Sequence, residues 1–223
     1  ETDTRKSGEK LFDYVNPRNR EVQIEMEQCV TDHLQRIGAY LQPGDYQPLP
    51  APENHPVTAS VIIPCRNRVR TIGDAIRSAL SQEVREGYSF NVIVVDDNSV
   101  DSTVEVIKSI PDERLIYIAQ DKTWHAIGGN WNMAIHDPRC GKYAIQLDSD
   151  DTYHDHTTVQ RFIDAFESNG NQSIPTYGAV IGTYQLTDME GNVLPPGVID
   201  HREWTDDNGR NNALRINGLG APR

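Results

Sequence analysis

The 223-residue sequence lacks several features that would each assign it to a particular class of protein. No apolar run approaches the roughly 18 residues of a transmembrane helix, so we expect no membrane-spanning helix. The segment from Glu1 to Lys10 is polar and shows no apolar region of the signal-peptide type. No internal repeat or low-complexity tract is present. With 37% hydrophobic and 24% charged residues, the composition instead favours a globular protein that can bury a core.

Cysteine and basic residues are both scarce. Cys29, Cys65 and Cys140 lie far apart and match neither a metal-binding spacing nor an even disulfide framework, which favours a reducing compartment. We therefore expect a cytoplasmic location, with peripheral membrane association left open. The formal net charge of −12 argues against non-specific nucleic-acid binding, so no nucleic-acid partner is expected. It does not exclude anionic ligands, because a metal ion and backbone N–H groups can hold a phosphate on an acidic protein.

Two segments are expected, an N-terminal region over 1–56 and a main domain over 57–223. The first contains a charged arm and a helix over 20–41, whose apolar residues recur at three- and four-residue steps. Pro43-Gly44 would end this helix, and the five prolines of 42–56 predict a stiff linker. The helix either serves docking and oligomer formation or packs on its own domain.

In the main domain, apolar strands alternate with helices. This pattern predicts an α/β fold with a mostly parallel sheet flanked by helices. Pro64 would end the first strand, Thr71 would cap the helix after it, and Gly128-Gly129 would form a turn before a short helix. The expected strands are 59–64, 91–95, 114–118 and 143–147, and the longer helices are 72–80, 102–110 and 157–168.

Polar residues follow three of these strands. They are Pro64-Cys65-Arg66-Asn67, Asp96-Asp97-Asn98-Ser99 and Asp148-Ser149-Asp150-Asp151. Ligands of parallel sheets bind outside the carboxyl ends of the strands, so we expect one shared acidic crevice. The last segment crowds three carboxylates into four residues, a cost that a divalent cation would remove. The alternative is a set of turns whose Asp residues cap the following helices.

Three kinds of chemistry use such a crevice. Phosphoryl transfer of the receiver type would need a Lys at a later strand end, whereas Lys142 precedes its strand. A dinucleotide oxidoreductase would need a glycine-rich turn after the first strand, and none is present. In a nucleotide-sugar transferase, Asp97 could accept a hydrogen bond from a base and Asp150 could bind a metal that stabilises the departing diphosphate.

Residues 57–151 resemble the nucleotide-binding half of an inverting family-2 glycosyltransferase with the GT-A fold. Val61 to Asn67 is similar to the family's first strand and its Pro-Thr-Tyr-Asn turn, although Cys65 and Arg66 replace Thr and Tyr. Val94 to Thr103 resembles its Asp-Asp-x-Ser-x-Asp-x-Thr segment, and Leu147 to Asp151 resembles its Leu-Asp-x-Asp-Asp metal motif. Gly129 to Ala134 matches its Ala-Arg-Asn-x-Gly segment only in part.

The resemblance implies a donor site for a UDP or GDP sugar and a Mn2+ or Mg2+ cofactor held by Asp150. The acceptor would be a glycan, a lipid or a small molecule, approached by a hairpin over 185–193 and by residues 211–220. Asp96 and Asp101 would hold a loop and cap a helix. The donor-binding residues implied are Pro64, Asn67, Asp97, Asn132 and Asp148.

An inverting transfer also needs a general base. No acidic pair in the family's context follows Gly191, and Glu203 and Asp206-Asp207 precede the acceptor-like segment. We therefore expect a chain without its catalytic base, as a fragment would be. The alternative to a transferase is a nucleotide-sugar-binding module without turnover, and a purely structural role would involve no nucleotide at all.

Overall fold

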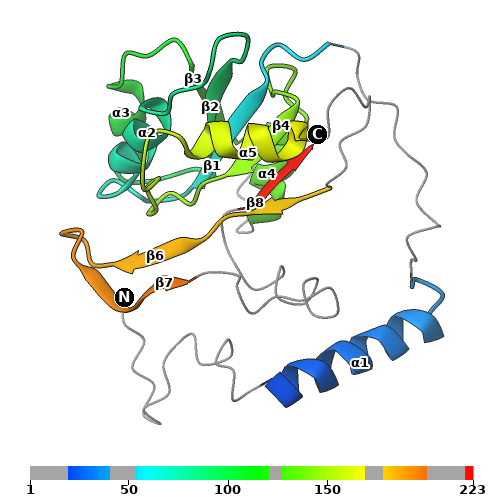
Figure 1. The fold of residues 1–223 in the computed structure, drawn as a ribbon. Coiled ribbons are helices and arrows are strands. Elements are labelled where there is room, and N and C mark those ends of the chain that lie inside the picture. The colour runs from blue at the N-terminus through cyan, green and yellow to red at the C-terminus, as the bar shows by residue number, and fades with distance from the viewer. Residues whose placement is uncertain (1–19, 41–53, 121–126, 169–177, 200–218, 223) are drawn as a thin grey trace. The chain divides into compact units, whose positions relative to one another are not determined.

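The computed structural model describes residues 20–40, 54–120, 127–168, 178–199 and 219–222 (Figure 1). The predicted arm, most of the predicted linker and residues 211–218 lie outside the described residues. The chain divides into two units, Glu1–Ala51 and Pro52–Arg223. No helix within the described ranges is long and apolar enough to cross a membrane.

In the first unit, the described element is helix α1 (Arg20–Arg36). It is shorter than the predicted helix, which was expected to run to Leu41 and to stop at Pro43. Gly38 takes a left-handed φ of +71°, and the N–H groups of Gly38 and Ala39 bond back to carbonyl oxygens in the last helical turn. This is a glycine-terminated helix end, so the earlier glycine stops the helix before the proline is reached.

The second unit contains a six-stranded sheet of order β3-β2-β1-β4-β8-β5. Strands β1, β2, β3 and β4 are mutually parallel, while β8 runs antiparallel to β4 and β5. The predicted mostly parallel α/β fold is therefore confirmed. The bounds are β1 (Ala59–Cys65), β2 (Phe90–Asp96), β3 (Leu115–Ala119), β4 (Tyr143–Gln146), β5 (Val180–Ile181) and β8 (Leu219–Pro222).

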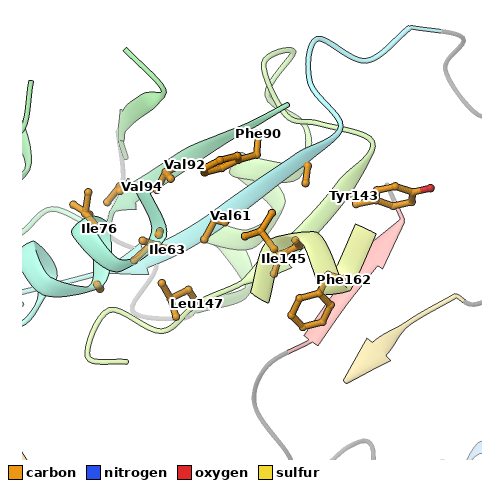
Figure 2. Close-up of a cluster of buried hydrophobic side chains, with 14 of the residues drawn as sticks. Val61, Ile63, Ile76, Phe90, Val92, Val94, Tyr143, Ile145, Leu147 and Phe162 are labelled. Carbon is orange, nitrogen blue, oxygen red and sulfur yellow. The ribbon is translucent and has the colours of Figure 1, made fainter. Parts of the chain in front are cut away.

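Helices cover both faces of the sheet, which explains why its central strands are apolar throughout. Alternate residues of β1, such as Val61 and Ile63, pack with α2, α3 and α5, whereas Ile62 packs with residues of α4 on the other face. Figure 2 shows Val61, Ile63 and Ile145 within the first of these clusters. The helices are α2 (Ile72–Leu80), α3 (Thr103–Lys108), α4 (Ile127–Ile135) and α5 (Thr158–Glu167).

Three local predictions were wrong. Strand β1 continues through Pro64 to Cys65, because its pairing with β2 extends to that residue. Gly128-Gly129 lies inside α4 rather than in a turn before it. Thr71 occupies the N-cap position of α2, but its side chain makes no capping hydrogen bond.

The expected hairpin is present as β6 (Tyr184–Thr187) and β7 (Val193–Ile199), which form a separate two-stranded antiparallel sheet (Figure 1). Asp188 shapes the turn, because its side chain accepts bonds from the N–H groups of Glu190 and Asn192. The short strand β5 that precedes this hairpin has two residues, Val180–Ile181.

Candidate functional site

The loops after β1 and β2 are built in step with each other. Register pairs Cys65 with Asp96 at the two strand ends. Just beyond this pair, the Asp97 N–H donates to the Cys65 carbonyl oxygen at 2.9 Å, so the two strand ends stay joined up to Asp97. Each loop then turns at an asparagine with a left-handed φ, +52° at Asn67 and +55° at Asn98. Asparagine tolerates this conformation better than most residues. Parallel pairing thus brings the first two predicted segments to one place.

Asn67 ties these two loops together. Its amide oxygen accepts a hydrogen bond from the Val100 N–H at 2.8 Å, and its own N–H donates to the Ser99 hydroxyl at 2.8 Å. The buried Asp96 carboxylate in turn accepts the Ser99 N–H at 3.1 Å and the Ser99 hydroxyl. The expected loop-holding role of Asp96 is visible here, and Asn67 shares it.

Asp101 has the helix-capping contacts predicted for it. Its carboxylate accepts the Thr103 N–H at 3.0 Å and the Thr103 hydroxyl. These hydrogen bonds, led by that from the hydroxyl, lower the pKa of Asp101. The Thr103 hydroxyl oxygen also accepts the Arg68 N–H at 2.7 Å, so the start of α3 is fastened to the loop after β1.

Asp97, the predicted base contact, is only 3% exposed and lies beside an arginine. Arg66 donates from Nη1 to the Asp97 carbonyl oxygen at 3.1 Å, and the same nitrogen lies 3.6 Å from the carboxylate Oδ2. Because a buried carboxylate is costly without a charged or hydrogen-bonded partner, this ion pair offsets part of the cost of burying Asp97. Pro64, the other donor-site candidate on β1, is buried within the strand.

The end of β4 reaches the same edge of the sheet. Ile62 pairs with Gln146, and the Leu147 N–H donates to the Ile62 carbonyl oxygen at 3.1 Å, so Asp148 lies two residues beyond the pair, as Pro64 does on β1. The Gln146 side-chain amide donates to Asp148 Oδ1 at 2.9 Å. Asp148 is half-buried, whereas Asp150 and Asp151 are exposed.

These carboxylates interact electrostatically. Although Asp151 is exposed as a residue, surrounding protein partly desolvates its carboxyl group, and the charges of Asp148 and Asp150 add to this effect. Together they raise the pKa of Asp151 to about 6. Crowding of like charges at this strand end, predicted from the sequence, is therefore present.

The carboxylate oxygens after β4 fit a hard cation that is also bound by the phosphates of a ligand. Within the described ranges, no three acidic, histidine or cysteine side chains are grouped closely enough to hold a metal by themselves. Mg2+ and Mn2+ prefer oxygen ligands, and Mg2+ is commonly bound through one or two carboxylates plus substrate phosphates. An exposed Asp150 beside a half-buried Asp148 can supply that limited number of oxygens.

On α4, the structure separates two asparagines of the partly matching motif. Asn132, the predicted donor contact, is exposed, whereas Asn130 is buried and accepts a hydrogen bond from the Gln120 side chain. The Gln120 N–H donates to the Asp96 carbonyl oxygen at 3.0 Å, so Asn130 is connected to the end of β2. Neither Asn130 nor Gln120 was predicted from the sequence to belong to this site. Asn130 stands inside the quoted motif, but Gln120 gave no signal of its own.

Comparison with known proteins gives one family match and several partial relatives. The family model described as Glycosyl transferase family 2 matches residues 60–215. The chain is 38% identical over 111 residues to the succinoglycan biosynthesis protein ExoO of Rhizobium meliloti, covering 50% of this chain and 30% of that protein. It is 37% identical over 92 residues to Escherichia coli WfaP, named UDP-Glc:alpha-D-GlcNAc-diphosphoundecaprenol beta-1,3-glucosyltransferase, covering 41% and 35%. It thus spans about a third of the length of these relatives.

Among solved structures, the crystal structure of S. aureus TarS in complex with UDP is similar at a TM-score of 0.44 and 26% identity. That similarity covers 49% of this chain and 33% of TarS.

Proposed function

Because the chain belongs to glycosyl transferase family 2, we propose that it acts in a metal-dependent transfer of a sugar, with inversion, from a nucleoside-diphosphate sugar to a hydroxyl acceptor. The observation that carries this proposal is the meeting of three polar strand ends at one edge of the sheet. A buried, arginine-paired Asp97 lies on one of them, and the acidic segment 148–151 lies on another. In this proposal, residues 57–223 form the donor-binding domain, and 1–56 is a separate N-terminal segment.

Each strand end has a distinct role in this proposal. Asp97 accepts a hydrogen bond from an N–H of the base, with Pro64 and Asn67 bordering the base and ribose. Asp148 and Asn132 face the ribose, diphosphate or sugar. Asp150 binds Mn2+ or Mg2+, which when bound stabilises the negative charge that develops on the departing nucleoside diphosphate.

The acceptor and the location belong to the same proposal. A relative is named for a diphosphoundecaprenol-linked acceptor, which supports a lipid-linked acceptor beside glycan and small-molecule ones. A cytoplasmic protein that associates with the membrane periphery would meet such an acceptor. Helix α1 would serve oligomer formation, which size-exclusion chromatography with light scattering of the full chain and a chain lacking 1–51 would test.

Titration calorimetry with UDP and GDP, with and without Mn2+, tests donor binding. We expect Mn2+-dependent binding of one nucleotide, weakened at least about 10-fold in Asp150→Ala because a metal ligand is lost. Asp164→Ala is the matched control, because it removes a half-exposed carboxylate on α5, away from the strand ends, that pairs with Arg85. Equal nucleotide affinity in wild type and Asp150→Ala would refute the metal role, and no binding of either nucleotide would refute the proposed function.

Turnover needs a separate measurement, because a module that only binds the donor would pass the calorimetric test. A steady-state assay of sugar release and transfer from UDP and GDP sugars distinguishes the two. Metal-dependent transfer supports the enzyme, whereas tight donor binding with no transfer to any supplied acceptor supports the binding module.

A further inference from the structure

Arg66 and Asp97 occupy equivalent places on neighbouring strand ends. Each follows the last paired residue of its strand, and each precedes an asparagine with left-handed φ. The hydrogen bonds between the two loops hold these backbones in step, so the guanidinium group is brought to the carboxylate by the register of the sheet. In the Pro-Thr-Tyr-Asn turn of the family that this segment resembles, a tyrosine stands where this chain has Arg66. The contact of the arginine with Asp97 is therefore a departure from the family pattern.

The pair combines a hydrogen-bond acceptor with a set of donors. The Asp97 side chain is 4% exposed, and that of Arg66 is 34% exposed, so the guanidinium reaches solvent beside a nearly buried carboxylate. A guanidinium has five N–H donors in a planar fork, and Nη1 supplies the contacts to the Asp97 carbonyl oxygen and to Oδ2. A ligand that approaches Asp97 therefore meets arginine N–H groups next to the carboxylate.

A uracil-type base has a matching edge. Its ring N–H lies between two carbonyl oxygens, so a carboxylate can accept the N–H while a neighbouring donor binds one of the oxygens. Cytosine has no ring N–H on that edge. Its unprotonated ring nitrogen would place a lone pair against the carboxylate, which is unfavourable. Guanine presents two adjacent N–H groups, which are best bound by both oxygens of a carboxylate. One oxygen of Asp97, Oδ2, already lies 3.6 Å from Arg66 Nη1, so the carboxylate is less suited to guanine.

We propose that Arg66 is a specificity-determining residue of the donor site, which reads a carbonyl oxygen of a uracil-type base while Asp97 accepts the adjacent N–H. This inference rests on the proposed function, since it requires that a nucleotide bind at this edge of the sheet. It selects uridine or thymidine diphosphate donors over guanosine ones. The purely structural alternative is that Arg66 only braces the loop through the Asp97 carbonyl oxygen.

The test is titration calorimetry in Mn2+ with UDP, GDP, CDP, 2-thio-UDP and 4-thio-UDP. Sulfur is the weaker acceptor, so the wild type should bind more weakly the analogue whose sulfur replaces the oxygen that faces Arg66. Arg66→Ala should weaken UDP binding about 10-fold to 100-fold, the range for a hydrogen bond to a charged group, and should lose the difference between UDP and that analogue. Arg66→Lys should recover only part of both effects, because it keeps the charge without the planar fork.

The matched control is Arg139→Ala, which removes an exposed arginine paired with Asp137, preceding β4 at the opposite end of the strand. It should leave all five affinities unchanged. A bracing role predicts a uniform loss of affinity with the UDP-to-analogue ratios preserved, and that result would overturn the proposal. So would equal wild-type affinity for UDP and both thio analogues, a measurement that does not depend on whether Arg66→Ala folds.

Failure of the inference and failure of the proposed function give different results. If the wild type binds no nucleotide, both fail. If it binds GDP in preference to UDP and Asp150→Ala weakens that binding, the proposed function stands and the assignment of Arg66 to a uracil-type base is wrong. Tighter UDP binding in Arg66→Ala would show that the arginine competes with the base for Asp97, which also overturns the inference.

Discussion

Replacing Asn67 should separate its backbone role from its side-chain role. An alanine at a φ of +52° is strained by about 1–2 kcal/mol, and loss of the bond from the Val100 N–H costs about 0.5–1.5 kcal/mol more. Asn67→Ala should therefore lower the free energy of unfolding by about 1.5–3.5 kcal/mol. Asn67→Gly loses the same hydrogen bond but relieves the strain, while its more flexible unfolded state costs about 0.4–1 kcal/mol.

The glycine variant should thus be more stable than the alanine variant by about 0.8 kcal/mol, the difference between the midpoints of the strain and flexibility ranges, measured by urea unfolding followed by circular dichroism. Asn98, with a φ of +55°, should show the same order when replaced by alanine and by glycine. If the alanine variant at Asn67 is as stable as the glycine variant, the left-handed turn does not govern this loop.

Nucleotide affinity should follow the same order, since the turn holds Arg66 against Asp97. Equal loss of affinity in both variants would instead indicate a direct contact between the Asn67 amide and the ligand.

Three further predictions concern the rest of the α/β unit. Gly141→Ala should destabilise the fold by about 1–3 kcal/mol in urea unfolding, because a Cβ there would lie 2.8 Å from a backbone atom of β1. Gly128→Ala, where a Cβ meets nothing within 4 Å in a helix, is the control and should be neutral or stabilising. Hydrogen bonds, with the largest effect from that of Lys142, lower the pKa of Glu167. The stability that these bonds add is therefore present above the usual pKa of 4.5 and is lost as the pH falls. Acid unfolding should therefore show a smaller loss of stability below about pH 5 in Glu167→Gln than in wild type, and parallel curves would contradict this assignment. A thiol reagent should label the exposed Cys29 rapidly, while the two buried cysteines react only on unfolding, and rapid labelling of all three would refute their burial.

The sheet could be predicted from the sequence because its central strands are buried on both faces. Continuous apolar runs then mark β1 and β2, and alternation with helices makes their pairing parallel. The exact ends could not be predicted, because they depend on the neighbouring strand. Pro64 is tolerated inside β1 since the pairing of β1 with β4 ends at Ile62, so the missing proline N–H lies beyond that ladder.

The candidate site was predictable at the level of strand ends but not of contacts. Asp97 and Asp148 could be assigned to one edge, because parallel strands bring their carboxyl ends together. The burial of Asn130 and the exposure of Asn132 depend on which face of α4 packs against the sheet. The glycines before them gave a turn signal that tertiary packing overrides. Likewise, the contact of Arg66 with Asp97 requires the register of two strands, which no local pattern contains.

The two halves of the candidate site differ in how far they are organised without a ligand. The loops after β1 and β2 hold each other through backbone and side-chain hydrogen bonds, and they enclose Asp97 beside an arginine. The acidic segment after β4 instead leaves Asp150 and Asp151 exposed and mutually repelling, a cost that rises as more of them ionise. Under the proposed function, the base therefore meets a preformed surface, whereas the diphosphate brings the cation that neutralises the other half. Recognition of the base and dependence on the metal are then separable properties, because they arise from different strand ends.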